Sequence, residues 1–166
     1  MQFKQKQEGI TIIELMIVIA IAAILLAIAA PSFNEYITDT QMVSTTSQLS
    51  GDLNRARSEA IKRNSWVLVC ARSNDATCGS DWNNGWLVCA DNEPNDACDA
   101  GTTANPNPIV VHQAINAKFT LTGDADFVRF NPNGTGGPDA LTLDFSGIKS
   151  RTANIAVTGN ISISNP

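Results

Sequence analysis

An apolar run at residues 10–30 constrains this chain most, because only Thr11 and Glu14 within it are polar. About 20 apolar residues in a helix are enough to cross a hydrocarbon core ~30 Å thick. The run therefore predicts a transmembrane helix. A carboxylate inside a bilayer is costly unless it is paired, so we interpret Glu14 as a functional residue.

A short polar leader, residues 1–9, precedes the run and carries Lys4 and Lys6. Basic residues beside a span favour the cytoplasmic side, so the chain after the span is expected on the opposite side. A secretory signal peptide is the competing interpretation. It would need a small-residue cleavage site after the run, where only the alanine-rich stretch 27–30 offers one. We favour a retained membrane anchor.

The junction between leader and run, Gly9-Ile10 followed by Glu14, resembles the prepilin peptidase site of type IV pilins and type II secretion pseudopilins. The resemblance implies cleavage after Gly9 and methylation of Ile10 as the new N-terminal residue. It also implies that Glu14 acts in assembly and that Pro31 matches the proline that follows the span. One departure is that the first mature residue is usually Phe in this family, whereas here it is Ile.

The chemistry of the cut chain supports an assembly role. A free amine at Ile10 and the carboxylate of Glu14 would both be stranded in lipid, where each is cheaper to bury beside an opposite charge. We therefore expect Glu14 to pair with the Ile10 amine of a neighbouring subunit. The alternative is a single-pass anchor whose Glu14 only reaches the membrane interface.

Residues 32–64 predict a continuation of the helix with an amphipathic pattern. One apolar stripe follows helical spacing, made of Met42, Leu49, Leu53, Ala56 and Ala60. Gly51 lies in this segment and lowers its intrinsic helix propensity by about 1 kcal/mol relative to Ala. We expect this half of the helix to lie against a folded domain.

Residues 65–166 change to short alternating segments punctuated by Gly, Asn and Pro, which is typical of β-strands and turns. The expected strands are 66–70, 86–89, a segment around Phe119, 127–130, 141–145, 155–157 and 161–163. The predicted fold class is α+β: a long N-terminal transmembrane and amphipathic helix packed on a small, mainly antiparallel β head. The predicted divisions are leader 1–9, transmembrane helix 10–31, amphipathic helix 32–64 and periplasmic head 65–166.

Four cysteines lie in the head, on the oxidising side that the predicted topology demands. Four cysteines allow three pairings. We favour Cys70 with Cys78 and Cys89 with Cys98, because each pair starts at the end of an apolar strand and closes a short loop. A zinc site is the competing interpretation, but the spacing has no C-x-x-C pair.

A finer resemblance, to the GspH, FimT and FimU branch of minor pilins and pseudopilins, rests on residues 54–63, 67–70, Gly85-Trp86 and 130–134. It implies a low-abundance subunit in or near the tip of a pilus, or of a secretion pseudopilus, that helps to start assembly. Such a subunit would contact other minor pilins or pseudopilins, the major pilin and the prepilin peptidase. It would reside in the bacterial inner membrane before it enters an extracellular pilus or a periplasmic pseudopilus.

We do not expect this head to bind DNA. FimT-like members of the branch bind DNA through a Gly-Arg-x-Arg pattern, and the matching place here reads Gly159-Asn-Ile-Ser162. Lys149 and Arg151 are the substitutes nearby in sequence, and we interpret them as solvated loop charges. After residue 64 the chain has ten acidic residues and five basic ones, a balance that repels phosphate.

Other chemistry is sparse, and no cofactor is expected. His112 follows two valines on an expected strand and is interpreted as structural. The loop from Asp91 to Asp96 could offer oxygens to Ca²⁺, but its spacing is not that of an EF-hand, so we interpret it as a solvated acidic loop. A structural minor pilin is thus the leading interpretation, ahead of a pseudopilin, a DNA-uptake pilin and a membrane-tethered enzyme.

Overall fold

The computed structural model describes residues 9–92, 97–99, 107–137, 139–145 and 149–165, without the side chains of residues 29–32, 139–140, 143 and 145. The chain divides into two units, Met1–Thr40 and Gln41–Pro166. One helix, α1 (Ile12–Arg63), contributes to both units. The calcium interpretation of the loop at 91–96 falls mostly outside the described residues.

Local hydrogen bonds set both ends of α1. At its start, the Glu14 amide donates to Thr11 Oγ1 at 3.2 Å and the Thr11 amide donates to Glu14 Oε2 at 3.5 Å, which is the reciprocal pattern of a capping box. At its end, Asn64 has a φ of 50°, and the Ser65 amide donates back to the Ala60 carbonyl at 3.2 Å. This geometry is a Schellman-type stop with Asn in the left-handed position, so the helix ends where the sequence pattern ends.

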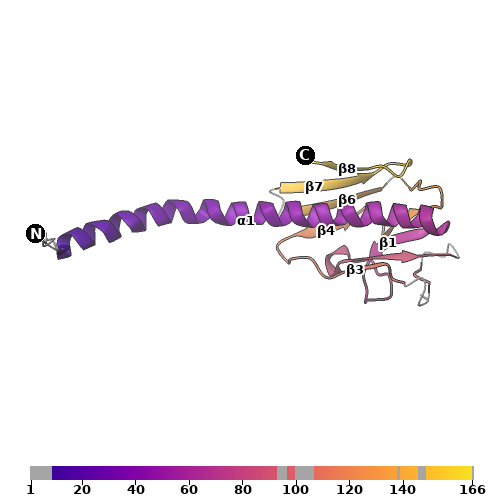
Figure 1. The fold of residues 1–166 in the computed structure, drawn as a ribbon, viewed down its shortest axis with the longest axis horizontal. Coiled ribbons are helices and arrows are strands. Elements are labelled where there is room, and N and C mark those ends of the chain that lie inside the picture. Colours follow the sequence, from indigo (N-terminus) through magenta and orange to yellow (C-terminus); the bar gives the residue numbers. More distant parts are fainter. Residues whose placement is uncertain (1–8, 93–96, 100–106, 138, 146–148, 166) are drawn as a thin grey trace, which may run out of the picture. The chain divides into compact units, whose positions relative to one another are not determined.

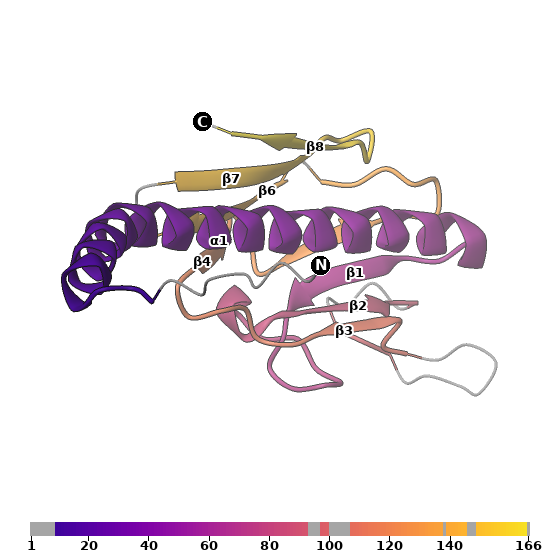
Figure 2. The same cartoon turned by 60° about the vertical axis from the view of Figure 1, so that its left-hand side comes forward.

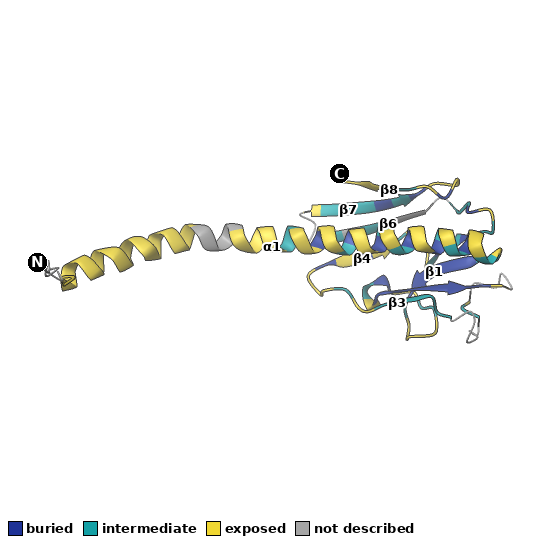
Figure 3. Cartoon of the chain, in the orientation of Figure 1, coloured by how far each residue is buried: buried dark blue, intermediate teal, exposed yellow. Residues whose placement is uncertain are grey.

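In the first unit, the side chains of α1 from Ile12 to Ile28 are exposed, and apart from Glu14 they are apolar. Ile12 is 81 % exposed and Ile28 is 68 % exposed, and Figure 3 colours this stretch as exposed apart from the undescribed residues. The mean hydropathy of its most apolar stretch is 3.0, so α1 is long and apolar enough to cross a membrane. α1 continues through Pro31.

In the second unit, α1 buries the stripe that the sequence predicts. All five residues of that stripe are at most 2 % exposed, and Figure 3 shows buried positions recurring along this part of α1. Thr46 is also buried on this face, and its hydroxyl donates to the Met42 carbonyl at 2.8 Å. The amphipathic prediction for this segment is confirmed.

The described residues of the head form two four-stranded sheets, ordered β3-β2-β1-β5 and β4-β6-β7-β8, in which all neighbouring strands are antiparallel (Figures 1 and 2). The strands are β1 (Val67–Ala71), β2 (Trp86–Ala90), β3 (Val110–His112), β4 (Thr120–Gly123), β5 (Phe127–Phe130), β6 (Asp139–Phe145), β7 (Lys149–Ile155) and β8 (Ile161–Ser164). A short 3₁₀ helix, η1 (Trp82–Asn84), precedes β2. The α+β architecture expected from the sequence is confirmed.

β1 and β2 are buried on both faces, which explains why both strands are continuously apolar. Alternate residues such as Val69 and Val88 join the core that includes α1. The intervening residues form a second cluster on the opposite face, made of Leu68, Cys70, Leu87 and Cys89. This sheet therefore separates a main core from a smaller, cysteine-containing core.

Two expectations about the C-terminal strands are wrong. The strand expected at 155–157 ends at Ile155, because residues 156–160 form a tight turn in which the Gly159 amide donates to the Ala156 carbonyl at 2.7 Å. Lys149 and Arg151, interpreted as loop charges, lie in β7 instead.

Candidate assembly site and disulfide-bridged head

The N-terminal residues that the sequence singles out lie together at the start of α1. Gly9 and Ile10 precede the helix, and Ile10 is 76 % exposed. Glu14 is in the first helical turn, where a carboxylate is favoured by the positive end of the helix dipole. Its bond to the Thr11 amide is at the 3.5 Å limit of hydrogen bonding, so the carboxylate is held weakly and can accept a stronger cationic partner.

The head holds two disulfides, Cys70–Cys78 and Cys89–Cys98, with sequence separations of 8 and 9. These are the pairs favoured from the sequence. Each joins the apolar end of a strand in the first sheet to the loop that follows it. Loops this short predict a stabilisation of about 2.5 kcal/mol for each bridge through the entropy of the unfolded chain.

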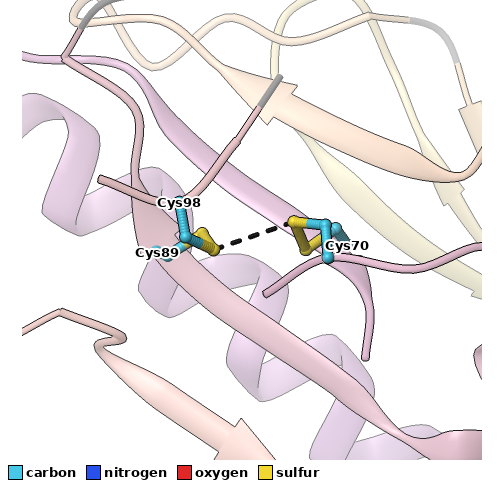
Figure 4. Close-up of side chains that lie close together, drawn as sticks. Cys70, Cys89 and Cys98 are labelled. Atoms are coloured by element: carbon cyan, nitrogen blue, oxygen red, sulfur yellow. Dashed lines mark hydrogen bonds between the residues drawn. A yellow bond between two sulfur atoms is a disulfide. The ribbon is translucent and has the colours of Figure 1, made fainter. Parts of the chain in front are cut away.

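The two bridges also lie against each other, which the sequence did not predict. The Sγ atoms of Cys78 and Cys98 are 3.7 Å apart, and all four sulfur atoms lie within 4.8 Å of one another. Figure 4 shows the two sulfur pairs facing each other across one face of the sheet. Cys78 and Cys98 therefore both pack against the smaller core on this face.

Asp91, interpreted as part of a solvated acidic loop, is fully buried. Its Oδ2 lies 3.5 Å from Nη2 of Arg129 on β5. The guanidinium of Arg129 also lies 5.6 Å from the Trp66 ring centroid and 5.5 Å from that of Phe127. The solvated interpretation of Asp91 is thus wrong. Local composition could not reveal a partner that is distant in sequence.

A polar network joins α1 to the edge of the first sheet. The indole Nε1 of Trp86 donates to Asp52 Oδ2 at 2.9 Å, and the His112 ring stacks on Trp86 with centroids 3.7 Å apart. Nε2 of His112 lies 2.8 Å from Gln48 Oε1. His112 therefore positions β3 against α1, in agreement with its interpretation as structural.

Arg57 of α1 binds two separate turns of the head. Its Nε donates to the Gly134 carbonyl at 2.9 Å and its Nη2 donates to the Thr158 carbonyl at 3.0 Å. Both bonds hold the half-buried Arg57 side chain against the head. The turn at Thr158 is the place where a DNA-binding relative would present arginines.

Lys149 and Arg151 lie away from that turn, at the other end of β7. They lie six and four residues before the end of β7, which at 3.3 Å per residue places them about 20 Å and 13 Å from the turn. Asn160 is exposed at the turn and Ser162 follows in β8. The two basic residues therefore sit at the wrong end of the strand.

Among the residues that the structure describes, Glu59 has a pKa that the fold clearly shifts. Its Oε2 accepts a hydrogen bond from Arg63 Nε at 2.7 Å, and its Oε1 lies 3.4 Å from Lys62 Nζ. The Arg63 hydrogen bond lowers the pKa of Glu59 below its ordinary value, while burial partly opposes the shift. Glu59 therefore keeps the last turn of α1 charged and paired at neutral pH.

A helix that packs its second part on antiparallel sheets, and whose first part is apolar and exposed, defines a protein of the type IV pilin class. Two crystal structures of the type IV minor pilin FimU from Pseudomonas aeruginosa share the fold, with TM-scores of 0.56 and 0.59 at 20% identity. The alignments cover 75% and 79% of this chain and 97% and 96% of the FimU chains.

Residues 45–160 match the family described as Type II transport protein GspH, and residues 4–30 match the prokaryotic N-terminal methylation motif. The chain belongs to the GspH family.

Curated relatives resemble this chain over a shorter part. The fimbrial protein EcpC of Eikenella corrodens is 52% identical over 56 residues, which is 34% of this chain and 36% of the relative. A fimbrial protein of Pseudomonas aeruginosa is 41% identical over 69 residues, or 42% of this chain and 44% of the relative. The matches thus span less than half the length of these relatives.

Proposed function

We propose that this protein is a structural minor pilin that assembles through its N-terminal helix into a type IV pilus. The observation that carries the proposal is the exposed apolar start of α1, capped by Thr11 and Glu14. Such a surface is stable only in lipid or against other apolar helices. The membrane covers this apolar surface before assembly, and neighbouring helices cover it in the filament.

The proposal includes processing. A prepilin peptidase cuts between Gly9 and Ile10, and Ile10 is then methylated, which the match to the N-terminal methylation motif supports. Before assembly the chain is a single-pass inner-membrane protein, with its head in the periplasm. Its partners are other minor pilins and the major pilin.

Position in the filament belongs to the same proposal. The FimU-like fold supports a low-abundance subunit at or near the tip that helps to initiate assembly. The family match to a type II transport protein favours one alternative, a minor pseudopilin of a type II secretion system. Both functions use α1 in the same way, and both are structural rather than enzymatic.

A pair of substitutions at Glu14 tests the assembly mechanism. Glu14→Gln keeps a side chain that can complete the capping box but removes the charge, whereas Glu14→Ala removes both. If Glu14 neutralises a neighbour's amine, both variants should be depleted from filaments sheared off the cell while their membrane levels stay normal.

The outcome of that pair is decisive for the role of Glu14. Incorporation of the Gln variant at the unmodified level, with loss of the Ala variant alone, would show that the helix cap is what matters. Normal incorporation of both would show that helix packing alone drives assembly. Recovery of the protein only with secretion-channel components would favour the pseudopilin.

A further inference from the structure

The four cysteine sulfur atoms form a cluster on one face of the β3-β2-β1-β5 sheet. Two separate disulfides would not have to lie this close together. Cys70 lies opposite Leu87 on the neighbouring strand, and Cys89 lies opposite Leu68. The register therefore places both cysteines on one face, diagonally across β1 and β2. Cys78 and Cys98 reach the same place from two separate loops.

The dimensions of this cluster match a tetrahedral four-sulfur metal site. Zinc–sulfur bonds of ≈ 2.3 Å in a tetrahedron place the sulfur atoms about 3.8 Å apart. Cys78 and Cys98 already have their sulfurs at 3.7 Å, and no pair in the cluster exceeds 4.8 Å. Reduction would let the two bonded pairs part, and a pair near 4.8 Å would close by about 1 Å.

The surroundings permit that opening. Cys70 and Cys89 are fully buried on the paired strands β1 and β2, while Cys78 and Cys98 are half-buried and leave the cluster accessible to solvent on their side. The Cα atoms within each pair are 5.6 Å and 5.4 Å apart, so the backbone already brings each pair close. The C-x₂₋₄-C spacing of common zinc modules is absent because strand register, rather than one tight turn, assembles the four residues.

We propose that the thiol form of the head binds one thiophilic divalent cation, of the Zn²⁺ class, through Cys70, Cys78, Cys89 and Cys98. The chain is synthesised with thiols, so this form precedes the disulfide form. On binding, four S–H bonds break, four protons leave to solvent, and four sulfur–metal bonds form.

The metal form and the disulfide form exclude each other. Two molecules of a disulfide oxidant take four electrons from the tetrathiolate and, with four protons, become four thiols. The head then forms its two bridges and releases the divalent cation. Metal occupancy would thus hold Cys78 and Cys98 against the smaller core until oxidation locks them there.

The test uses the full chain in detergent, reduced by a phosphine and freed of reagent without oxygen. Co²⁺ is the probe, since tetrahedral tetrathiolate cobalt has characteristic visible and charge-transfer bands. We expect one Co²⁺ for each chain, near-ultraviolet circular dichroism of a folded head, and displacement of Co²⁺ by Zn²⁺. The disulfide form of the same protein should show no such bands.

Two variants make the test specific. Cys98→Ser removes one ligand and should abolish the tetrathiolate bands, whereas Ser80→Ala, in the neighbouring loop, should retain them. Absence of the bands in the reduced protein would overturn the proposal. So would unchanged bands in Cys98→Ser, or bands from a chain without folded circular dichroism, because the fold must assemble the site.

Discussion

At the scale of single residues, Arg57 has the most distinctive role in the head. Its guanidinium donates to backbone carbonyls of two turns, at Gly134 and Thr158. A charged donor to a carbonyl contributes more than a neutral one, and its loss leaves acceptors without that partner. The planar fork of Arg also spans two acceptors in a way that Lys does not.

We therefore expect Arg57→Ala to lower the free energy of unfolding by about 2 kcal/mol. Arg55→Ala is the matched control, because Arg55 lies two residues before Arg57 on the same helix and is exposed. Its change in the free energy of unfolding should stay within about 0.5 kcal/mol. Urea unfolding of the full chain in detergent, followed by tryptophan fluorescence, measures both. Equal effects of the two variants would show that the Arg57 bonds contribute nothing specific.

Glu59 gives a pH-dependent prediction. Because folding lowers its pKa, its contribution to stability is present above the ordinary carboxylate pKa and is lost as the pH falls through the lowered value. Glu59→Gln should lower the free energy of unfolding by about 0.5 kcal/mol at pH 7 and by progressively less at acidic pH. Asp124→Asn, at an exposed position, serves as control. A Glu59→Gln penalty that does not shrink on acidification would contradict the account.

Among the secondary-structure elements, α1 and the turn between β7 and β8 differ in whether they require a glycine. A Cβ on Gly51 would meet no atom within 4 Å, whereas a Cβ on Gly159 would lie 2.0 Å from the Gly134 carbonyl oxygen, at a φ of +74°. The helix tolerates Gly51, but the turn requires Gly159. The same carbonyl accepts the Arg57 bond, so the two turns and α1 meet at this point.

Gly51→Ala should stabilise the protein by about 0.5–1 kcal/mol through helix propensity. Gly159→Ala should destabilise it by more than about 2 kcal/mol, because both the left-handed φ and the close approach resist a side chain. The same urea measurement compares them. A mild effect at Gly159 would mean that the turn rearranges freely.

Periodicity and turn residues predicted the elements well but not their assembly. The apolar stripe of α1 and the end of the helix near Arg63 follow from spacing and local capping, which are encoded by neighbours in sequence. The order β3-β2-β1-β5 brings β5 beside β1 across a long sequence separation. Strand periodicity carries no information on such pairing. The burial of Asp91 against Arg129 depends on that pairing, and the contact between the two disulfides depends on the register of β1 with β2. Periodicity predicts neither.

At the scale of the whole molecule, charge argues against nucleic acid as a partner. The chain has 16 acidic residues against 11 lysines and arginines, with a formal net charge of −5. Arg57, the arginine that reaches the β7–β8 turn, is engaged by two carbonyls. A phosphate-binding surface at this turn would need cations that the turn does not provide.

We expect the full chain in detergent to bind duplex DNA no better than weakly and non-specifically, with the affinity vanishing as salt rises toward physiological strength. A mobility-shift titration at several stated salt concentrations measures this. Micromolar binding that persists at physiological salt and is lost in a Lys149→Ala, Arg151→Ala double variant would place the protein among DNA-uptake pilins.

Cleavage after Gly9 and entry into a filament through the exposed apolar helix are the core of the proposed function. Intact-mass analysis of the protein recovered from sheared surface filaments tests both. We expect a polypeptide that begins at Ile10 and carries one added methyl group. A protein that retains Met1, one that begins after Ala30, or one absent from filaments of piliated cells would contradict the proposed function.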